Sequence, residues 1–563
     1  MPARLAASIG QLQAVTPKFE QVLDVPFGGV LFSLPALLAC GLLLDIEKFF
    51  ELPRGYYGIQ SIFLMLAFMA LARLKNPEAL RFYAPGEWGK LLGLDRSPEV
   101  RTLREKMGIL SKQGQLEAWR AKLCAHWVKE DTEMGFLFYV DGHVRVYHGS
   151  QTPLPKHYVA REKLCLRATV DYWVNALDGQ PFFFVNKAVD PGLIQVLEKD
   201  IVPQLEEQIP VLSEAALASS PLQHRFTLVF DREGYSPDLM KRLKEKRIAC
   251  ITYHKYPKDD WNEQEFVMHL VRRASGNAVE VKLAERGTLL SSKLWVREIR
   301  RLTETGRQIS ILSTDYCSEL HGIAAEMSDR WSQENFFKYM REHFNLDRLI
   351  DYSIEEINET TEVVNPKYRK VESEIRRLAA LHSRRLSEFG QLHLENDIEP
   401  TLVELYQQKK ATLQEDIQTL AQKLDTAKKE RKSIKRHICL EELPKEQRFS
   451  RLGTDAKNFI DTIKMVAYRA ETAMANLLRE KIPRRGEERS LLRALYQTEC
   501  DLLPDEKNKT LTVQLHHLAN HYSDKLIQHL CDELNATRMK FPGTDLRLFY
   551  KMGTLQNPRD QVV

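Results

Sequence analysis

The spacing of hydrophobic positions divides the chain into three kinds of segment. Residues 1–130 and those after Pro366 carry apolar side chains at helical intervals, whereas short β-rich runs dominate residues 133–350. Runs such as FLFYV, FTLVF and PFFFVNKAV first form a meander and then alternate with helical stretches. This order predicts a mixed sheet of the α/β kind. A strand-rich block between about 255 and 312 indicates an insertion before the last helix of this region.

The second half of the N-terminal region contains a pair of short helices. After the first helix and a turn, Ser97 is expected to cap the second helix, with Pro98 at its first position. Three basic residues follow along this second helix: Arg101, Arg104 and Lys106. The pattern fits a helix-turn-helix whose second helix binds the major groove of DNA. It fits an ordinary helical hairpin with solvated basic side chains equally well.

The segment after Pro366 predicts a long helical hairpin. Apolar residues recur there at heptad spacing: Leu413, Ile417, Leu420, Leu424 and Ala427. Gly390 and Pro400 interrupt the helical pattern, so we expect two antiparallel helices rather than one rod. Residues 407–437 carry nine Lys or Arg and four Asp or Glu, a net charge of +5. A solvated helix face is the ordinary interpretation, and contact with phosphates is the alternative.

Composition limits the classes of protein to consider. The chain has 563 residues, of which 43% are hydrophobic and 28% charged, which is an ordinary globular balance. A net charge of only +4 means that any nucleic-acid surface must come from local clustering. The eight cysteines form no C-x-x-C pair, which disfavours a zinc site or a disulfide framework and favours reduced thiols in the cytosol. The apolar stretch 27–44 is interrupted by Gly and Pro and is followed by another apolar helix, so we expect buried helices, with a membrane anchor as the alternative.

Three acidic residues stand out as candidates for chemistry. Asp141 follows the strand FLFYV and Asp231 follows the strand FTLVF, and ligands of α/β sheets bind where such strands end. Glu334 lies within a later helix, where it shares one face with three basic residues: Arg330, Lys338 and Arg341. Such spacing often produces a surface ion-pair ladder. The neighbouring Trp331 and Phe337 indicate instead that this helix packs against other elements.

Two Asp residues on separate strands and a Glu in a following helix resemble the DDE triad of RNase H-like transposases of bacterial insertion sequences. The "VDGH" and "DREGYS" segments are similar to the first and second motifs of that family, and the third segment resembles its YREK signature. Arg330 and Glu334 match the signature spacing. Met327 stands in place of the Tyr, and Arg341 in place of the Lys. The strand-rich block between Asp231 and Glu334 resembles the β-insertion of this transposase branch.

The resemblance implies a two-metal phosphodiester chemistry. Asp141, Asp231 and Glu334 would be the catalytic residues and would bind two Mg²⁺ ions, for which Mn²⁺ can substitute. Water would first nick the transposon end, and the freed 3′-hydroxyl would then attack target DNA or the opposite strand. Phosphates near the scissile bond would be bound by basic residues of the third motif, namely Arg330, Lys338 and Arg341. Trp295 is interpreted as a packed strand residue, with stacking of a flipped base as the alternative.

The expected partners are double-stranded DNA, as inverted-repeat ends and target, and further copies of the chain in a synaptic complex, with no membrane. The expected location is the bacterial cytoplasm, at the nucleoid. Two alternatives remain open: an RNase H-like nuclease that does not transpose, and a catalytically dead DNA-binding coiled-coil assembly protein. Metal-dependent cleavage distinguishes them.

The predicted fold class is an α/β RNase H-like catalytic domain with a β-rich insertion, flanked by an all-α N-terminal domain and an all-α, partly coiled-coil C-terminal region. We predict four domains along the chain. Residues 1–130 form a helical domain with a possible helix-turn-helix, and residues 131–350 form the catalytic domain, with the insertion at about 255–312. Residues 351–445 form the helical hairpin or coiled coil, and residues 446–563 form a C-terminal helical domain.

Overall fold

The structure is a computed structural model. It describes residues 2–130, 136–149, 152–159, 161–187, 189–273, 278–348, 354–355, 357, 360–393, 400–444, 448–482, 484 and 486–553. The chain divides into two compact units. The first contains residues 1–147, 156–353 and 452–563, and the second contains residues 148–155 and 354–451. The first unit is a mixed α/β structure, and the second is mainly helical.

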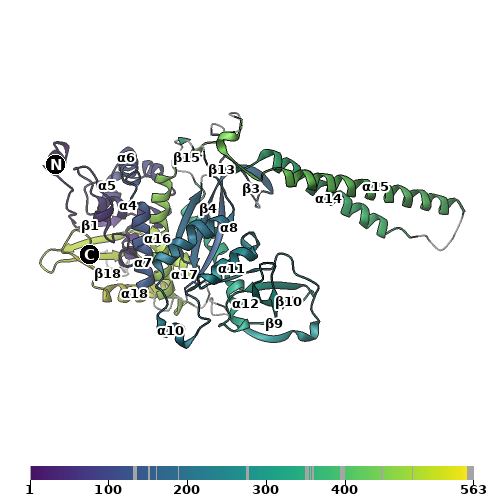
Figure 1. Ribbon diagram of the computed structural model, residues 1–563. Helices are drawn as coiled ribbons and strands as arrows, with labels where there is room; N and C mark the ends of the chain where they lie inside the picture. Colours follow the sequence, from purple (N-terminus) through teal and green to yellow (C-terminus); the bar gives the residue numbers. More distant parts are fainter. Residues whose placement is uncertain are drawn as a thin grey trace. The chain divides into compact units, whose positions relative to one another are not determined.

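The N-terminal region of the first unit is mainly helical (Figure 1). Its elements are α1 (Pro2–Ser8), β1 (Val22–Val25), the 3-10 helix η1 (Gly28–Ser33), α2 (Leu34–Ala39), α3 (Ile46–Phe49), α4 (Ile59–Leu71), η2 (Pro77–Phe82), α5 (Pro85–Lys90), α6 (Val100–Ser111) and α7 (Leu116–Glu130). The apolar stretch 27–44 forms the buried η1 and α2, and α4 is buried along most of its length, as predicted. Among the described residues, no helix is both long and apolar enough to cross a membrane.

Helix α6 begins later than its sequence predicts. Glu99, not Ser97, precedes the first helical residue, and Pro98 lies outside the helix. The buried Ser97 is held in the preceding connection, because its N–H donates to the carbonyl of Pro85 and its carbonyl accepts from the Tyr57 hydroxyl. The backbone of this connection passes so close to α5 that a Cβ on Gly89 would lie 2.4 Å from the Cα of Arg96. Tertiary packing therefore decides where α6 starts.

A ten-stranded sheet forms the middle of the first unit. Its strands are β2 (Leu137–Val146), β3 (Lys156–Val159), β4 (Leu164–Ala176), β5 (Pro181–Lys187), β6 (Phe226–Phe230), β7 (Ile248–Tyr253), β8 (Val267–Arg272), β9 (Ala278–Leu289), β10 (Trp295–Leu302) and β11 (Gln308–Ser313). They lie in the order β3-β4-β2-β6-β7-β11-β10-β9-β8, with β5 also paired to β4. The pairs β2–β6 and β6–β7 are parallel. The strands of the block 255–312 continue this sheet, because β11 pairs with β7.

Short helices connect and cover these strands. They are α8 (Leu193–Val196), the π-helical turn η3 (Leu197–Ile201), α9 (Val202–Gln208), α10 (Glu214–Ser219), η4 (Arg232–Gly234), α11 (Pro237–Glu245), η5 (Glu263–Glu265), α12 (Leu320–Asp329) and α13 (Trp331–Phe344). Ser236 caps α11 by accepting from the Leu239 N–H, and Pro237 occupies the first helical position. Helix α12 packs on the strands of the insertion, whereas α13 packs on β2. This difference brings the start of α13 next to the central strand.

The C-terminal region of the first unit contains both helices and strands. It comprises α16 (Asp455–Arg479), α17 (Glu487–Gln497), β16 (Cys500–Asp505), β17 (Thr510–Leu515), α18 (His521–Ala536) and β18 (Arg547–Met552). The strands form one sheet in the order β1-β16-β17-β18. The prediction that both flanking regions are all-α is therefore wrong. TLTVQL alternates polar and apolar residues as a strand does, and its sheet is completed by a long-range pairing, Val22 with Leu502.

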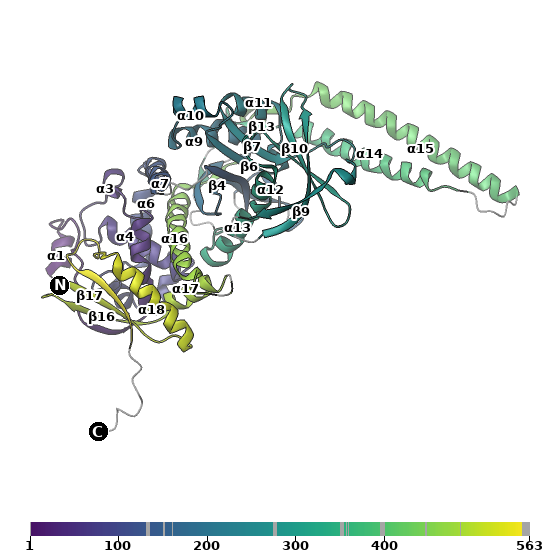
Figure 2. The same cartoon turned by 90° about the horizontal axis from the view of Figure 1, so that it is seen from below.

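Helix α16 is the centre of the helical part of this unit. It contacts α2, α4, α6 and α17, and both views show it next to α4 and α17 (Figures 1 and 2). Most of its residues are buried, including Arg469, which donates to the carbonyl of Pro181, and four other charged residues: Lys457, Asp461, Lys464 and Glu471. These side chains are paired. Lys457 bonds Asp461, and Glu471 bonds Arg73 and the Tyr339 hydroxyl of α13. Buried charges require such partners, so α16 fixes α13 and the N-terminal helices to one another.

The second unit is built on a helical hairpin. Helix α14 (Pro366–Gly390) and helix α15 (Pro400–Ser433) run antiparallel, side by side in both views (Figures 1 and 2). Their seam is apolar: Ile375, Leu378, Leu420 and Ala427 are buried and form one cluster. The remaining elements are β12 (Ile354–Glu355), β13 (Glu362–Val364), β14 (His437–Cys439), η6 (Leu440–Glu442) and β15 (Arg451–Leu452), and β13 pairs with β14 at the base of the hairpin.

Candidate active site

Two parallel strands place Asp141 and Asp231 side by side. Strands β2 and β6 pair in register from Leu137 with Thr227 to Val140 with Phe230, and each Asp is the next residue along its strand. Neighbouring strands lie about 4.8 Å apart. The residues before both acids are buried on both faces of the sheet, as is usual for parallel strands. The apolar strands therefore determine the position of both carboxylates at one edge.

The turn after β6 fixes Asp231. Its side chain caps η4 by accepting from the Glu233 N–H at 2.8 Å, and its carbonyl accepts from the Thr252 hydroxyl at 3.0 Å. Gly234 in the same turn is buried, and a Cβ there would lie 2.4 Å from the ring of Phe230. Only glycine lets this turn fold back onto its own strand. The tight turn thus explains why the DREGYS segment has a glycine at position 234.

Glu334 reaches the same edge through helix α13. The buried Gln333, one residue earlier, donates from its Nε2 to the carbonyls of Tyr139 and Trp173 and to Oδ1 of Asn175, at 3.3, 3.0 and 2.9 Å. These acceptors belong to β2 and β4. The first turn of α13 is therefore attached to the two strands at the centre of the sheet, and Glu334 is placed beside the middle of β2, where its parallel pairing with β6 ends.

Arg330 connects the first and third acids. Its Nη1 donates to Oδ2 of Asp141 at 3.4 Å, and its Nη2 donates to Oε1 of Glu334 at 2.8 Å. The Arg330 side chain is 15% exposed, and the residue lies at the junction of α12 and α13. Together with the strand register, these contacts place the three acids in one region of the sheet, although Asp231 lies 90 residues after Asp141 and Glu334 lies 103 residues after Asp231. Salt bridges this sheltered are stronger than those on an open surface.

The acids have an excess of negative charge. The Asp141 side chain is 27% exposed. Burial raises its pKa to about 7; the positive charge of Arg330 opposes this rise, and the negative charge of Asp231 adds to it. One guanidinium therefore compensates the cluster only partly. Such a perturbed carboxyl, within β2 at the point where its parallel pairing with β6 ends, is a physical mark of a functional site.

Two further acids border the site and were not singled out in the sequence. Glu233 has a raised pKa, first because of burial and then because of Asp231 and Asp190. Asp190 accepts from the Tyr172 hydroxyl and from the Gly192 N–H. Signals for both were present: Glu233 lies two residues after Asp231, and Asp190 lies just past the end of β5. An acid shortly after a strand is common in turns, so neither signal was specific.

The donor groups suit a hard divalent cation. Asp141, Asp231 and Glu334 offer only carboxylate oxygens, which Mg²⁺ prefers over nitrogen or sulfur ligands. The guanidinium of Arg330 shows that a positive charge is accommodated between Asp141 and Glu334. A divalent cation would stabilise the charged form of Asp141 and so lower the pKa that burial raises. The chemistry of the donor groups therefore suits such an ion, but among the described residues the oxygens of Asp141, Asp231 and Glu334 do not all lie within 4.8 Å of one another.

The remaining residues of the third motif lie around this site at different depths. Lys338 is exposed on α13, one turn after Glu334. Arg341 is half-buried, and its Nε donates to the carbonyl of Phe337 at 3.4 Å. Met327 is buried in the apolar cluster under α12, whereas Trp331 is 61% exposed. Met327, which stands where the YREK signature has Tyr, thus lies in a hydrophobic core.

The three basic residues predicted for DNA binding in the N-terminal region lie on α6. Leu103, Met107 and Leu110 form its buried face. Arg101 and Arg104 are exposed, and Arg104 forms an ion pair with Glu78 at 3.0 Å. Lys106 is half-buried, and its pKa is lowered by that burial. The helix therefore presents Arg101 and Arg104 to solvent. A role in DNA binding for all three stays a prediction.

Trp295 is not the packed strand residue that we expected. It lies at the start of β10, is 53% exposed, and stacks on Tyr316 with ring centroids 6.2 Å apart. Its ring covers Gly287 of β9, where a Cβ would lie 2.0 Å from the indole. The cross-strand glycine leaves the space for this ring, which the local sequence could not show.

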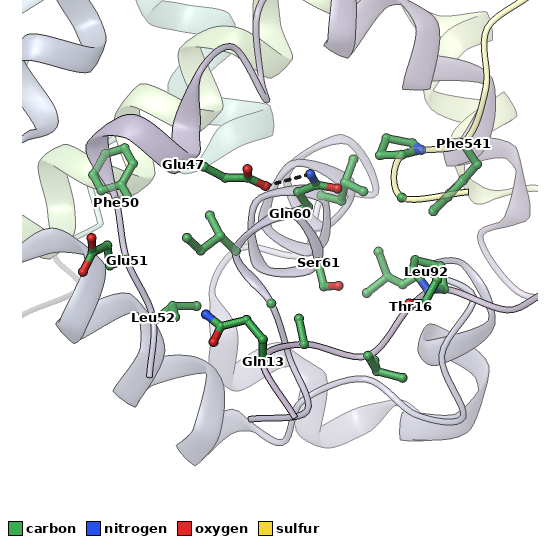
Figure 3. Close-up of a pocket in the computed structure, with 18 residues that line it drawn as sticks. Gln13, Thr16, Glu47, Phe50, Glu51, Leu52, Gln60, Ser61, Leu92 and Phe541 are labelled. Atoms are coloured by element: carbon green, nitrogen blue, oxygen red, sulfur yellow. Dashed lines mark hydrogen bonds between the residues drawn. The ribbon is translucent and has the colours of Figure 1, made fainter. Parts of the chain in front are cut away.

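Two other features of the first unit lie apart from the acids. Asp24, Asp501 and His516 bring potential ligand atoms within 4.8 Å of one another, but His516 Nε2 already bonds Asp501 at 3.0 Å, so we assign no metal to them. A cavity of about 660 Å³ among the N-terminal helices contains none of the residues discussed above (Figure 3). Figure 3 shows Glu47 and Gln60 on its wall, bonded at 3.1 Å.

Comparison with known sequence families gives one match. A family model described as "Transposase protein" matches residues 2–554, which is nearly the whole chain and includes all the residues of the candidate site. No curated protein matches the chain.

Proposed function

The chain belongs to this transposase family, and we propose that Asp141, Asp231 and Glu334 form its catalytic centre. In this proposal the protein cleaves the inverted-repeat ends of a DNA element and joins the freed 3′-hydroxyl to target DNA. Family membership implies a DNA-processing enzyme. The observation that carries the finer proposal is the convergence of the three acids through the β2–β6 register and the bridge made by Arg330.

An RNase H-like core is part of the proposal. Its support is the strand order β5-β4-β2-β6-β7, in which Asp141 lies on the central strand and Asp231 follows the parallel neighbour. In sheets of this kind the functional groups gather at the carboxyl ends of the parallel strands. Helix α13 then delivers the third acid from the face of the sheet.

Within this site, the acids would hold two Mg²⁺ ions. When bound, two such ions supply activation of the attacking oxygen and stabilisation of the leaving oxygen. The protein's own groups have separate tasks. Gln333 and the strand register hold the carboxylates in position. Arg330 offsets part of the negative charge of Asp141 and Glu334 before substrate binds, and Arg330, Lys338 and Arg341 provide positive charge for the DNA phosphates.

We propose double-stranded DNA as the substrate and a homo-oligomer as the working form, because joining requires two element ends to be held together. A nuclease without joining activity would share the same acids. It would be distinguished by cleavage products that never become joined to target DNA.

The test is cleavage of a duplex that carries the inverted-repeat ends flanking the gene. We expect nicking that requires Mg²⁺ or Mn²⁺ and is lost in Asp141→Ala, Asp231→Ala and Glu334→Ala, each by about a hundredfold or more, because each removes several kcal/mol of charge stabilisation. Glu342→Ala is the matched control, because Glu342 is an exposed acid on the same helix.

Melting temperatures show whether each variant is folded. Full cleavage by any of the three folded triad variants would contradict the assignment. Binding of the ends without any cleavage by the wild-type protein would favour the DNA-binding assembly protein instead.

A further inference from the structure

The helical hairpin of the second unit has two halves of very different charge. We define its basal half as residues 366–377 of α14 and the facing residues 426–437. The basal half contains eleven Lys or Arg and three Glu, a net charge of +8. The distal half, residues 378–390 and 400–425, contains five basic and five acidic residues. Because the whole chain carries only +4, the residues outside the basal half sum to −4.

Folding brings the two basic segments together. They are about 60 residues apart along the chain, and the antiparallel hairpin places both at the same end. Contacts across the base confirm the juxtaposition. Arg431 pairs with Glu372 at 2.7 Å, and Asn365 bonds the carbonyls of Lys435 and Arg436 at 3.1 and 2.9 Å. The sequence showed only one of the two segments as a charge run, so the combined surface is a property of the fold.

Most of these basic side chains are exposed and lack an acidic partner. Four of the eleven form ion pairs: Arg376, Arg377, Lys429 and Arg431. In the described part of the chain, the other seven make no ion pair and are exposed: Lys367, Arg369, Lys370, Lys428, Lys432, Lys435 and Arg436. Their mutual repulsion is only partly offset within the hairpin, where Asp425 attracts Lys428 and Lys432. A polyanion would relieve it.

We propose that the basal half of the hairpin is a DNA-backbone-binding surface, separate from the catalytic centre; this inference rests on the proposed function. Twelve helical residues span about 18 Å, over which a duplex carries roughly ten phosphate charges, so the charge densities match. Lys428 and Lys432 are one turn apart on α15, which suits contacts along a strand. Lys and Arg side chains that contact only phosphates, with no helix or strand inserted into a groove, bind DNA independently of its base sequence.

The test compares two quadruple variants of the full chain. The basal variant is Lys367→Gln, Lys370→Gln, Lys428→Gln and Lys432→Gln. The distal variant removes the same charge from exposed residues of the distal half, with Arg384→Gln, Lys409→Gln, Lys410→Gln and Lys423→Gln. Affinity for a fluorescent duplex of about 30 base pairs is measured over a series of salt concentrations. Circular dichroism checks that the helical hairpin persists in both.

We expect the basal variant to lose at least about tenfold in affinity and to lower the slope of log K against log[salt] by about 3. The distal variant should change each by much less. Equal effects of the two variants, or no effect of either, would overturn the proposal. So would binding of the wild type to vesicles of anionic lipid that is lost in the basal variant while DNA affinity is kept.

The outcome separates this inference from the proposed function. If the wild type cleaves in a triad-dependent way and the basal variant binds DNA normally, only the surface is wrong. If the basal variant loses DNA affinity while no condition gives cleavage, the surface stands and the catalytic assignment fails.

Discussion

The acidic edge of the sheet and the basal half of the hairpin gather charge in opposite ways. At the edge, three acids come from segments far apart in the chain: Asp141 and Asp231 follow buried residues of β2 and β6, and Glu334 lies on helix α13. In the basal half, most basic side chains stand on exposed helix faces, Lys435 and Arg436 lie just past the end of α15, and seven of the basic residues lack an ionic partner among the described residues. The first arrangement shifts a pKa, that of Asp141, to about 7.

This difference predicts how strongly substitutions in each region affect function and whether their effects add. Charges in a sheltered site interact strongly, because the local dielectric constant is low and water is partly excluded. The removal of one group then changes the state of the others. Charges on an exposed helix are screened and act almost independently. We therefore expect large, non-additive effects at the edge and small, additive effects on the hairpin.

The largest effect that tests this contrast comes from Gln333→Leu. The substitution leaves three buried acceptors on β2 and β4 without their donor, which costs about 1–3 kcal/mol of stability. Because Gln333 fixes the start of α13, we expect cleavage to fall by about tenfold to a hundredfold, as for residues that position metal ligands. DNA affinity should be unchanged. The measurements are the cleavage rate, the affinity for the duplex and the melting temperature.

Glu342→Gln is the control for that variant, because Glu342 is an exposed residue of α13. If Gln333→Leu melts at a lower temperature but cleaves at the wild-type rate, Glu334 does not depend on the attachment of α13. The acidic edge would then tolerate substitution as well as the helical hairpin does.

The second effect is a dependence on pH. The pKa of Asp141 is raised to about 7 in the folded chain from an ordinary value near 3.8. The folded protein therefore binds one proton more than the unfolded chain between about pH 4 and pH 7, and stability falls as pH rises through this window. Mg²⁺ binds the deprotonated carboxylate, so below pH 7 its affinity should fall by up to about tenfold per pH unit.

Thermal melting with and without Mg²⁺ measures both parts of this prediction. Stabilisation by Mg²⁺ should be largest above pH 7 and should shrink as the pH falls. Asp141→Asn should remove this pH dependence, since its side chain is neutral at every pH. A stabilisation by Mg²⁺ that is the same at pH 5 and pH 8 would show that the ion does not bind Asp141.

The sequence predicted the residues of the edge because strands leave a local signal. An apolar run followed by an acid predicted a strand end at both Asp141 and Asp231. Strand β6 does end before Asp231, but β2 continues through Asp141 to Val146, so that part of the prediction is wrong. The parallel register that brings them together, and the bridge by Arg330, are long-range facts. Gln333 gave no signal at all, because a single buried Gln in a helix is indistinguishable from a solvated one until its three acceptors are known.

Other predictions were wrong or incomplete. Strands β16 and β17 were missed although they pair locally with each other and TLTVQL alternates polar and apolar residues; only their pairing with β1, nearly 480 residues away, is long-range. Trp295 was assigned to the interior because aromatic residues in strands usually pack, but it covers a glycine on the surface instead. In the hairpin, the heptad predicted the seam, and Leu413, Leu420 and Ala427 are buried. The joined basic surface required knowledge of which helix ends meet.

The smallest effect is also the sharpest test of additivity. Lys428→Gln removes one exposed charge from the basal half, and Lys409→Gln removes one from the distal half. We expect the first to weaken duplex binding by about twofold to threefold and to lower the salt slope by about 1, and the second to do neither. Combining Lys428→Gln with Lys367→Gln should multiply the two losses, because screened charges on different helices couple weakly. A double variant much weaker than that product would mean that the basal charges act as one cooperative site, as the acids of the edge do, and the contrast between the two regions would be lost.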